Sequence, residues 1–521
     1  MIDREAADGW VVVMAAEQRR LDALAVTLGV PGDDLVESAG RAAADRIVAS
    51  VRLGCVAVLA GPGGNGADAL VAARRLREAG HDVVTFLFLP RGAPSPSVEH
   101  ALRLLIETGG VIERLGSGSL AAAEAALSRA DLVIDGLYGS GLSRPLDGAA
   151  AEIVRLVNGC KADVVSLDVP SGILADNGEV AGPAVKATTT LAMEFLKPAH
   201  LLFPAAGLCG EVAVVPVAYP AEAREGAIAW ARVLDRASVR RRLPPRPPAG
   251  HKGTFGHVLL VAGSVGMVGA AILAGRASLR SGAGLLTVGI PASQAATVHA
   301  ALPEALVVSL AEERGHITPA GVENLGAALG RATVLAMGPG LSRDEETSAA
   351  VLAALRAFGG PVVVDADAIY ALSRSPETLG TLAGRAILTP HPGEFAFLSG
   401  MSVADVDRDR VAVAPDFARR SDVIAILKGR PTAIGLPDGR TYLNPTGNAG
   451  LAKGGSGDVL TGIVAGLVAA GASLEDAALV GPYVHGLAAD LFAIAGSERS
   501  LLPSDVVDLL PQALREVERC E

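Results

Sequence analysis

The chain of 521 residues is too long for one ordinary hydrophobic core and fits two domains of roughly 220 and 280 residues. Half of its residues are hydrophobic, only 3% are aromatic and 62 are glycine, which excludes disordered and fibrous classes and is typical of α/β enzymes. The formal net charge of −11 predicts that neither nucleic acid nor an anionic membrane is a partner.

The chain carries no pattern of a secreted or membrane protein. Its first thirteen residues, MIDREAADGWVVV, are acidic and lack the basic start and apolar stretch of a secretory signal, and Met14 is a second candidate start. The longest apolar run, residues 459–474, is interrupted and too short to span a bilayer. Four cysteines lie far apart without metal spacing: Cys55, Cys160, Cys209 and Cys520. We therefore expect a cytoplasmic protein with no membrane role, and a homo-oligomer.

The first half alternates helical and strand-like segments. Helical patterns over residues 16–28 and 36–51 open the chain. Strand-like runs separated by Ala/Leu/Arg-rich helical stretches follow at CVAVLA (55–60), DVVTFLF (82–88), DLVIDGL (131–137) and DVVSLDV (163–169). This alternation predicts parallel strands joined by crossover helices.

A second α/β series follows a proline- and arginine-rich segment. The segment VRRRLPPRPPAGHKG, residues 239–253, breaks helical and strand patterns, so we place the domain junction there or shortly before it. Its alternative role, a basic docking patch for nucleic acid, is less favoured because it has no interleaved aromatic residues. The later strand-like runs are GHVLLVAGS (256–264), ATVLAMGPG (332–340), PVVVDADAI (361–369), RAILTPH (385–391) and VIAILKG (423–429).

A glycine-rich loop follows the first strand. In AGPGGNGADALVAARRL, Gly61, Gly63 and Gly66 fit the spacing G-x-G-x-x-G at the start of a helix. The next strand has Asp82 at its beginning and Arg91 after its end, so the acid that would hold a ribose in an ordinary nicotinamide dehydrogenase is missing. The loop can bind phosphate through its amides, or serve only close packing.

Two carboxylates end later strands, Asp135 in DLVIDGLYGSGLSRPLDG and Asp168 in VVSLDVPSGI, at the edge of a parallel sheet where ligands bind. Together with EQRRLDALAVTLGVPGDDLVESAG (17–40), these stretches resemble the epimerase domain for hydrated NADH and NADPH, the YjeF N-terminal domain. The resemblance covers residues 14–222 and implies a Rossmann-like three-layer αβα fold that interconverts the R and S hydrates.

The resemblance also implies site residues. Asn65, Asp135 and Ser171 would hold a potassium ion, and Asp168 would be the acid/base group, although an Asp at this place can instead cap the following turn. The residues that would contact the dinucleotide are Gly64, Asn65, Gly66, Ala67, Asp68, Gly139, Ser140, Gly141, Leu142, Ser143, Arg144, Pro145 and Asp168.

The glycine loop departs from the family pattern, NNGGDG. It reads GNGADA over residues 64–69, with one side-chain amide lost and two methyl groups gained, at Ala67 and Ala69. We expect each methyl to narrow the space for phosphate, and binding to persist because Asn65 and Asp68 remain.

The second half contains another phosphate-loop candidate, GGSGD, residues 454–458, before an apolar helical run. Loop amides and a helix start form an anion hole, and Asp458 beside it can accept a hydroxyl proton during phosphoryl transfer. The alternative is a plain helix start at which Asp458 only favours the helix dipole. Walker A spacing is absent.

Six motifs in the second half agree in order and spacing with one family. They resemble those of the ADP-dependent NAD(P)H-hydrate dehydratase, the YjeF C-terminal domain, over residues 236–516. The resemblance implies a ribokinase-like α/β fold and phosphorylation of the S hydrate, followed by loss of phosphate. The motifs are HKGTFGHVLLVAGSVGMVGAAILAGRASLRSGAG, AMGPGLS, VVVDADAIYAL, LTPHPGEF, LKGRPTAIG and NPTGNAGLAKGGSGDVLTGIVAGLVAAG.

By position, the resemblance implies that Asp458 is the base. The hydrate would contact Ala270, Gly340, His391 and Asp458, and the adenine nucleotide would contact Lys428, Gly429, Arg430, Pro431, Thr432 and Gly457. Three further carboxylates, Asp365, Asp367 and Glu394, are expected to position Mg²⁺ through water. Ile369 replaces a polar amide of the family, and we expect a modest change in substrate contacts.

Two other functions fit parts of the sequence. The second half could be a small-molecule kinase for a vitamin precursor or a sugar alcohol, which would release a stable phosphorylated product. The first half could be a catalytically silent nucleotide-binding module, in which case Asp168→Asn would leave repair of mixed hydrates unchanged.

Overall fold

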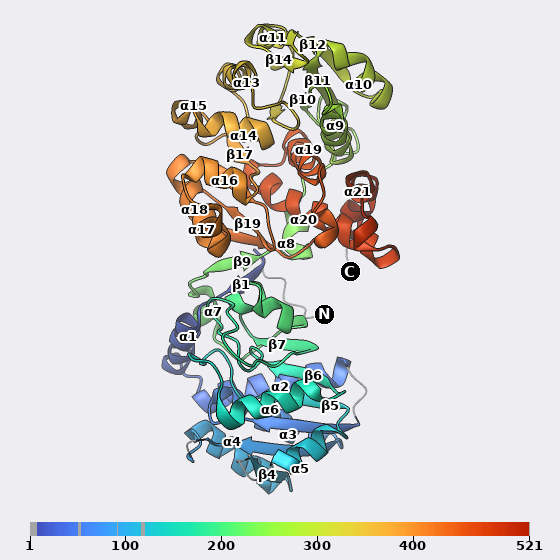
Figure 1. Cartoon of the computed structure of the whole chain (residues 1–521). Coiled ribbons are helices and arrows are strands. Elements are labelled where there is room, and N and C mark those ends of the chain that lie inside the picture. The colour runs from blue at the N-terminus through green and yellow to red at the C-terminus, as the bar shows by residue number, and fades with distance from the viewer. Residues whose placement is uncertain (1–7, 51–53, 91, 116–119, 520–521) are drawn as a thin grey trace. The chain divides into compact units, whose positions relative to one another are not determined.

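The computed structural model describes residues 8–50, 54–90, 92–115 and 120–519, and Figure 1 shows their elements. Two compact units divide between Trp230 and Ala231, and residues 8–9 belong to the second unit. The predicted domain limits, 14–222 and 236–516, stay predictions for the functional domains. Three residues singled out from the sequence, Val51, Arg91 and Cys520, lie outside the described residues.

The first unit has one parallel sheet in the order β4-β3-β2-β5-β6-β7-β8. The strands of this sheet are β2 (Cys55–Ala60), β3 (Asp82–Phe88), β4 (Val111–Leu115), β5 (Leu132–Gly136), β6 (Asp163–Leu167), β7 (Thr189–Met193) and β8 (Glu211–Val215), and the unit also contains β1 (Trp10–Val12), which is not part of this sheet. Its helices are α1 (Ala15–Thr27), α2 (Gly32–Ser50), α3 (Gly64–Glu78), α4 (Pro96–Glu107), α5 (Leu120–Leu127), α6 (Gly148–Gly159) and α7 (Ala221–Glu225), with short 3₁₀ turns η1 (Pro198–His200) and η2 (Ala205–Leu208).

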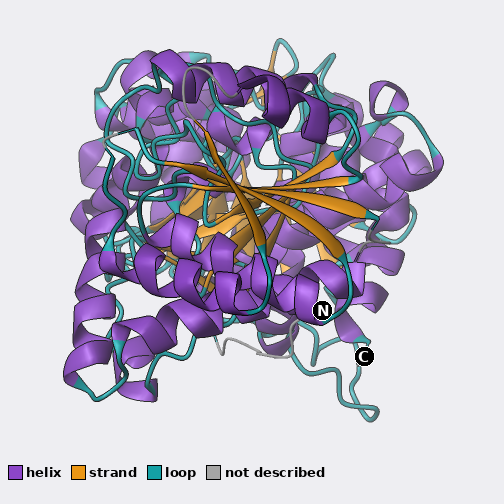
Figure 2. Ribbon diagram, turned by 90° about the horizontal axis from the view of Figure 1, so that it is seen from below, coloured by secondary structure: helices purple, strands orange, loops and turns teal. Residues whose placement is uncertain are grey.

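Both faces of this sheet are buried. Alternate residues of β2 point to two cores: Val56 and Val58 join the side of α1 to α4, whereas Ala57 and Leu59 join the side of α5 and α6. Such burial requires a helix layer on each face, and Figure 2 shows strands between layers of helices. The predicted Rossmann-like three-layer fold is therefore confirmed.

The strand order reverses at β2, which lies between β3 and β5. The glycine-rich loop follows β2, and residues 137–147 follow β5, so both loops leave the same edge of the sheet at this reversal. Ligands of doubly wound sheets bind at such a point.

The second unit has a larger sheet in the order β9-β20-β19-β18-β17-β16-β15-β10-β11-β12. Its strands are β9 (Ala231–Val233), β10 (His257–Val261), β11 (Leu285–Pro291), β12 (Leu306–Leu310), β15 (Val334–Met337), β16 (Val362–Val364), β17 (Ala386–Leu388), β18 (Ile424–Leu427), β19 (Thr432–Gly435) and β20 (Thr441–Asn444), and a small hairpin joins β13 (Glu312–Glu313) to β14 (His316–Ile317). Along this order, the strands β18, β17, β16, β15, β10, β11 and β12 are parallel to one another, as predicted. The strand β19, in contrast, is antiparallel to both β18 and β20. The short turn between β18 and β19 accounts for this, because parallel neighbours need a long crossover.

Helices flank this sheet as the ribokinase-like α/β prediction requires. They are α8 (Arg236–Arg241), α9 (Val268–Arg280), α10 (Ala295–Ala301), α11 (Pro319–Glu323), α12 (Gly326–Leu329), α13 (Glu345–Ala357), α14 (Ala366–Ser373), α15 (Pro376–Gly380), α16 (Pro392–Ser399), α17 (Val403–Arg408), α18 (Arg410–Ser421), α19 (Ser456–Ala469), α20 (Leu474–Ala495) and α21 (Pro503–Glu518), with 3₁₀ turns η3 (Ala292–Gln294), η4 (Ala449–Leu451) and η5 (Glu498–Ser500).

The helix α20, which the sequence analysis did not single out, is long and apolar enough to cross a bilayer by length and composition alone. However, 67% of its most apolar window is buried inside the protein, and it packs against α19 and α21. It is therefore a core helix of the second unit.

Glycines on α19 bring that helix against the backbone of α9. A Cβ atom at Gly462 would lie 2.1 Å from the carbonyl oxygen of Ala274, and one at Gly466 would lie 2.4 Å from that of Ser278. These contacts leave no room for a methyl group, so the small residues set the distance between the two helices. Both helices begin at the same edge of the sheet, and the GGSGD loop lies at that edge too.

We predict that Gly462→Ala destabilises the second unit by about 2 kcal/mol or more, because the methyl group must push α9 away. The matched change Gly326→Ala should be neutral or slightly stabilising, since no atom lies within 4 Å of its added Cβ. Differential scanning calorimetry of both variants measures this. Equal melting temperatures for the two would contradict the packing argument.

Candidate active sites

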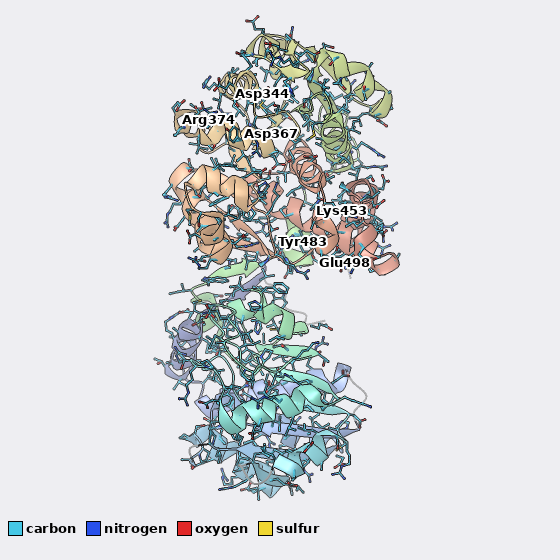
Figure 3. The ribbon with its side chains drawn as sticks, in the orientation of Figure 1. Asp344, Asp367, Arg374, Lys453, Tyr483 and Glu498 are labelled. Carbon is cyan, nitrogen blue, oxygen red and sulfur yellow. The ribbon has the colours of Figure 1, made fainter. Side chains whose placement is uncertain are left out.

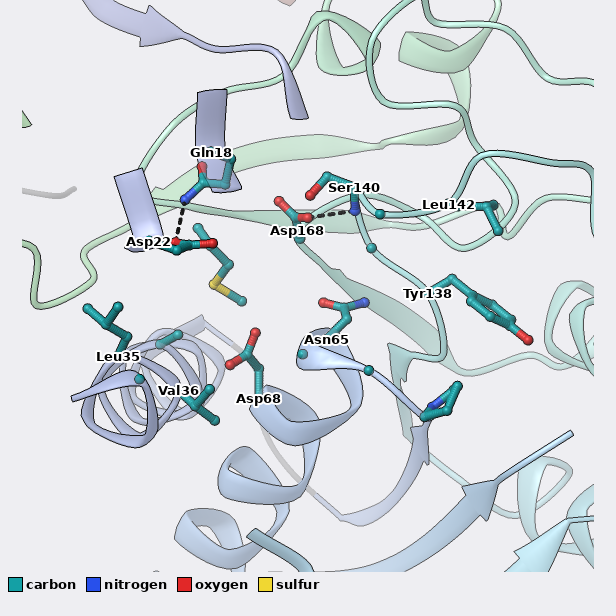
Figure 4. A pocket seen from close by; sticks show the side chains of 18 of the residues that line it. Gln18, Asp22, Leu35, Val36, Asn65, Asp68, Tyr138, Ser140, Leu142 and Asp168 are labelled. Carbon is teal, nitrogen blue, oxygen red and sulfur yellow. Dashed lines mark hydrogen bonds between the residues drawn. The ribbon is translucent and has the colours of Figure 1, made fainter. Parts of the chain in front are cut away.

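The first unit contains a cavity of about 860 Å³ at the reversal of its strand order (Figure 4). The glycine loop, the loop after β5, α1 and α2 form its walls. The predicted dinucleotide contacts that line it are Gly64, Asn65, Asp68, Gly139, Ser140, Gly141, Leu142, Ser143, Arg144 and Asp168.

Three predicted contacts, Gly66, Ala67 and Pro145, do not line the cavity. Gly66 is buried, and a Cβ there would lie 2.0 Å from the carbonyl oxygen of Gly61, so this glycine closes the turn. Ala67 and Ala69 are fully buried in the core between α3 and the sheet. The expectation that their methyl groups narrow the phosphate space is therefore wrong, because α3 begins at Gly64 and turns both methyl groups away from the cavity.

Asp168 follows β6 directly, and both its backbone and its carboxylate are fixed by hydrogen bonds. Its backbone is left-handed, with φ of 61°, a conformation that costs energy for a residue other than glycine. Its Oδ2 accepts a hydrogen bond of 2.8 Å from the amide of Ser140, and its Oδ1 lies 3.0 Å from Nζ of Lys197. His200 adds a hydrogen bond of 2.7 Å from Nε2 to the Asp168 carbonyl oxygen.

The Lys197 ammonium decides the ionisation of Asp168. Burial alone raises the pKa of Asp168, but Lys197 and the Ser140 amide more than offset this and lower it to about 2. Lys197 itself is completely buried and also donates to the Phe195 carbonyl oxygen. Asp168 is thus an anion at neutral pH, so it can accept a proton but has none to give.

Burial also explains the state of His200. Its pKa is lowered to about 4 by burial and by the positive charge of Lys197. The neutral ring accepts at Nδ1 from the Lys197 amide and donates at Nε2, so it joins the backbones of Lys197 and Asp168. The sequence analysis missed both residues, because it did not recognise the strand β7 that precedes the motif KPAH.

The predicted potassium ligands are oxygen-rich and partly unsatisfied. Asp135 is fully buried, and burial raises its pKa although Ser171 and Ser166 donate hydrogen bonds to it. The side-chain amide of Asn65 is buried with neither its oxygen nor its nitrogen bonded to any described residue. An orphaned amide oxygen is a ligand that a monovalent cation can take, so Asn65 leaves an oxygen available for K⁺.

In the second unit, the neighbouring parallel strands β10, β15, β16, β17 and β18 end at one edge. The predicted site segments follow four of them: Gly338–Gly340 after β15, Asp365 after β16, His391 after β17 and Lys428 after β18. The second turn of α19 lies against the same edge, since Oγ1 of Thr461 donates a hydrogen bond of 2.7 Å to Oδ2 of Asp365. Figure 3 shows the side chains around this edge, with Asp367 labelled at the start of α14.

A lysine joins the carboxylates of this site. Nζ of Lys428 lies 3.0 Å from Oδ1 of Asp365 and 3.7 Å from Oε2 of Glu394. A Cβ at Gly457 would lie 3.2 Å from the same nitrogen, so the glycine lets the GGSGD loop approach the ammonium. Burial alone would lower the pKa of Lys428, but the carboxylates of Asp365 and Glu394 raise it by more. The net pKa is therefore raised, and the ammonium stays charged.

Unlike Asp365, which pairs with Lys428, Asp458 has no hydrogen-bonded or ion-paired cation among the described residues. Burial and the charge of Asp365 raise its pKa to about 7, although Lys428 acts in the opposite direction. A carboxylate that titrates near neutral pH is suited to general base catalysis. The buried hydroxyl of Ser456, at the first residue of α19, has no partner among the described residues.

The remaining predicted hydrate contacts lie at the same edge. Gly340 touches Ala270, since a Cβ on Gly340 would lie 3.0 Å from that of Ala270. His391 begins α16, where its Nδ1 accepts from the amides of Gly393 and Glu394. Its side chain is 52% exposed, so it is not a packed core histidine.

The predicted nucleotide loop, residues 428–432, leads from β18 into β19. Oγ1 of Thr432 donates to the carbonyl oxygen of Gly429, which tightens the turn, and Pro431 is buried while Arg430 is exposed. The guanidinium of Arg410 lies against Gly429, so a side chain at position 429 would require the guanidinium to move. Sequence reasoning missed Arg410, because eighteen positions without any motif separate the two.

The predicted magnesium carboxylates do not form a coordination group. Asp365 is bonded to Lys428 and Thr461, while Asp367 accepts from the amide of Ser342 and from Arg343 at 3.0 Å. No cluster of three or more His, Cys, Asp or Glu side chains that could hold a metal occurs in the described parts of the chain. The prediction that Asp365, Asp367 and Glu394 position Mg²⁺ through water stays a prediction.

Two family profiles match the two units. Residues 32–199 match the YjeF-related protein N-terminus, and residues 258–512 match NAD(P)H-hydrate dehydratase. The bifunctional NAD(P)H-hydrate repair enzyme of Moorella thermoacetica is 38% identical over 97% of both chains. The chain belongs to the family of bifunctional NAD(P)H-hydrate repair enzymes.

Other relatives agree. The bifunctional repair enzyme of Thermofilum pendens is 36% identical over 94% of this chain and 93% of its own. A solved ADP/ATP-dependent NAD(P)H-hydrate dehydratase of Bacillus subtilis, co-crystallised with ATP/Mg²⁺, is 35% identical, with a TM-score of 0.47, over 55% of this chain and 98% of its own. The chain accordingly combines an epimerase domain with a dehydratase domain.

We predict that Lys197→Met lowers epimerase kcat about 100-fold at neutral pH. Without the ammonium, burial raises the pKa of Asp168, so the variant should lose its base form as pH falls and regain activity as pH rises. R-to-S conversion, followed by chromatography against pH, measures this. The exposed-lysine control Lys186→Met should behave as wild type, and a wild-type pH profile for Lys197→Met would contradict the role of Lys197.

We predict that kcat/KM of the dehydratase falls as pH drops through about 7, because Asp458 is then protonated and can no longer accept a proton. Asp458→Asn should lower kcat about 1,000-fold or more and abolish this dependence in the residual rate. Recovery of NADH absorbance from the S hydrate measures both. Asp508→Asn, on an exposed side chain, is the matched control.

Proposed function

We propose that the repair enzyme carries out its two reactions at the two sites described above, the epimerase in residues 14–222 and the dehydratase in residues 236–516. The observation that carries the proposal is Asp458 beside Lys428, at the start of α19 and at the carboxyl ends of four strands. A base, a cation and helix amides thus surround one space, as phosphoryl transfer to a hydroxyl requires.

In the dehydratase reaction, Asp458 accepts the proton of the ring hydroxyl of the S hydrate. The hydroxyl oxygen then forms a bond to the terminal phosphorus of the nucleotide, and the bond to the leaving nucleotide breaks. The ring nitrogen pushes out phosphate, and loss of a proton from the adjacent ring carbon restores NADH or NADPH. Ala270, Gly340 and His391 would contact the hydrate.

We propose ADP as the phosphate donor, with AMP and phosphate as products. Lys428 and the first amides of α19, including that of Gly457, would bind the transferred phosphoryl group, and Gly429 to Thr432 would bind the rest of the nucleotide. The unpartnered hydroxyl of Ser456 supports a ligand at this helix start. Mg²⁺ would enter bound to the nucleotide phosphates as part of the substrate.

In the epimerase reaction, the ionised carboxylate of Asp168 would act as the base toward the hydrated ring. Asn65, Asp135 and Ser171 would hold K⁺, which when bound supplies positive charge beside the phosphate-binding loops. Homo-oligomerisation and a cytoplasmic location stay predictions.

The decisive experiment gives the protein a mixture of R and S NADH hydrates with Mg²⁺, K⁺ and either ADP or ATP. Full recovery of NADH absorbance is expected, faster with ADP, and Asp168→Asn should stop recovery at the S fraction. If the wild type restored NADH only from the S hydrate and left the R hydrate unconverted, the first unit would be a silent binding module. A stable phosphorylated product without NADH would identify the second unit as a small-molecule kinase.

A further inference from the structure

Three carboxylates line the cavity of the first unit, and only two of them have hydrogen-bond donors. Asp168 accepts from Lys197 and Ser140, and Asp22 accepts from the hydroxyl of Tyr219. Asp68 lines the same cavity from the second turn of α3 and has no hydrogen-bond or ion-pair partner in the described part of the chain. Figure 4 shows Asp68 and Asp168 pointing into the cavity from different elements.

The surroundings of Asp68 disfavour its charged form. It is half-buried in the wall of the cavity, and the charged groups that act on it most strongly are the carboxylates of Asp168 and Asp22. The pKa of Asp68 is raised well above its ordinary value. Burial is the largest cause, and the two negative charges add to it. The fully buried ammonium of Lys197 is bonded to Asp168, and Arg144 lies on the exposed loop after β5.

The hydroxyl of Tyr219 does not change this balance. It is hydrogen-bonded to Asp22, and burial raises its pKa, so it stays neutral. The cavity therefore contains one carboxylate, Asp168, that is ionised because a lysine neutralises it, and one, Asp68, whose charged form no described cation stabilises.

We propose that Asp68 is the proton donor of the epimerase reaction, acting on the substrate together with the ionised Asp168. An epimerase needs an acid and a base at the same carbon, and pairs of carboxyl groups whose environments separate their protonation states supply both.

The step balances as follows. The carboxylic acid of Asp68 gives its proton to the ring hydroxyl, the bond between that oxygen and the ring carbon breaks, and water leaves while the ring nitrogen lone pair forms a double bond to the carbon. A water molecule then adds to the opposite face and loses a proton to the carboxylate of Asp168. The second proton transfer leaves Asp168 protonated and Asp68 ionised, so the reverse reaction, or proton exchange with solvent, restores the starting state.

Asp68→Asn tests this in the full-length protein. Omission of nucleotide stops the dehydratase, so conversion of pure S hydrate to the equilibrium mixture, followed by chromatography, reports the epimerase alone. We expect kcat to fall about 100-fold or more, with KM changed by less than about threefold. The wild-type kcat/KM should fall as pH rises, because the acid form of Asp68 is then lost, and the residual rate of the variant should lack this limb.

Two further measurements decide between a chemical role and a binding or structural one. Addition of ADP to the same variant should restore NADH from the S hydrate at the wild-type rate, which shows that the second unit is folded, and the nearly unchanged KM of the epimerase reports the fold of the first unit. In H₂¹⁸O, label should enter the hydroxyl as the wild type epimerises, and Asp68→Asn should slow both processes equally. The exposed-carboxylate control Asp45→Asn should match wild type.

A raised KM with unchanged kcat, or epimerisation without uptake of label, would overturn the role of Asp68. The inference rests on the epimerase activity of the first unit. A wild-type protein that interconverts no hydrate would overturn that activity itself, which distinguishes the two failures.

Discussion

Each site has fewer buried cations than carboxylates, and the rest of its chemistry depends on this shortage. Lys197 lies 3.0 Å from Asp168, and Lys428 lies 3.0 Å from Asp365. A carboxylate that is taken out of water without a cation is costly in its ionised form, so the neighbouring carboxyl groups shift toward the protonated form. Asp68 in the first unit and Asp458 in the second are two carboxyl groups whose pKa is raised in this way.

The two units use this shortage differently. In the second unit the carboxyl group without its own cation is Asp458. It titrates near neutral pH, which suits a general base that acts during phosphoryl transfer from a nucleotide. In the first unit the paired group, Asp168, is firmly ionised, and the unpaired group is the one that can carry a proton. The same arrangement of a strand-end aspartate and a buried lysine therefore supports two kinds of proton transfer.

Parallel strands make these clusters possible, because their carboxyl ends meet at one edge of a sheet. Glycines then allow the close approaches that the clusters need. Gly457 brings the GGSGD loop to Lys428, and Gly462 and Gly466 seat α19 on α9. In the first unit, Gly61 and Gly66 close the turn after β2, so that α3 directs Asp68 and Asn65 toward the cavity and its alanines toward the core.

The sequence by itself determined the features that contiguous residues encode. The strands β2, β3, β10 and β18, both glycine loops and the strand-end aspartates all follow from local patterns, because a strand, a turn and a helix start each depend on neighbouring positions. Only the tertiary structure decided which charged groups meet. Lys197 is 29 residues from Asp168 and Lys428 is 63 from Asp365, and no local pattern links either pair. Protonation states depend on burial and on such distant neighbours, so the different roles of Asp68, Asp168 and Asp458 emerge only when the chain is folded.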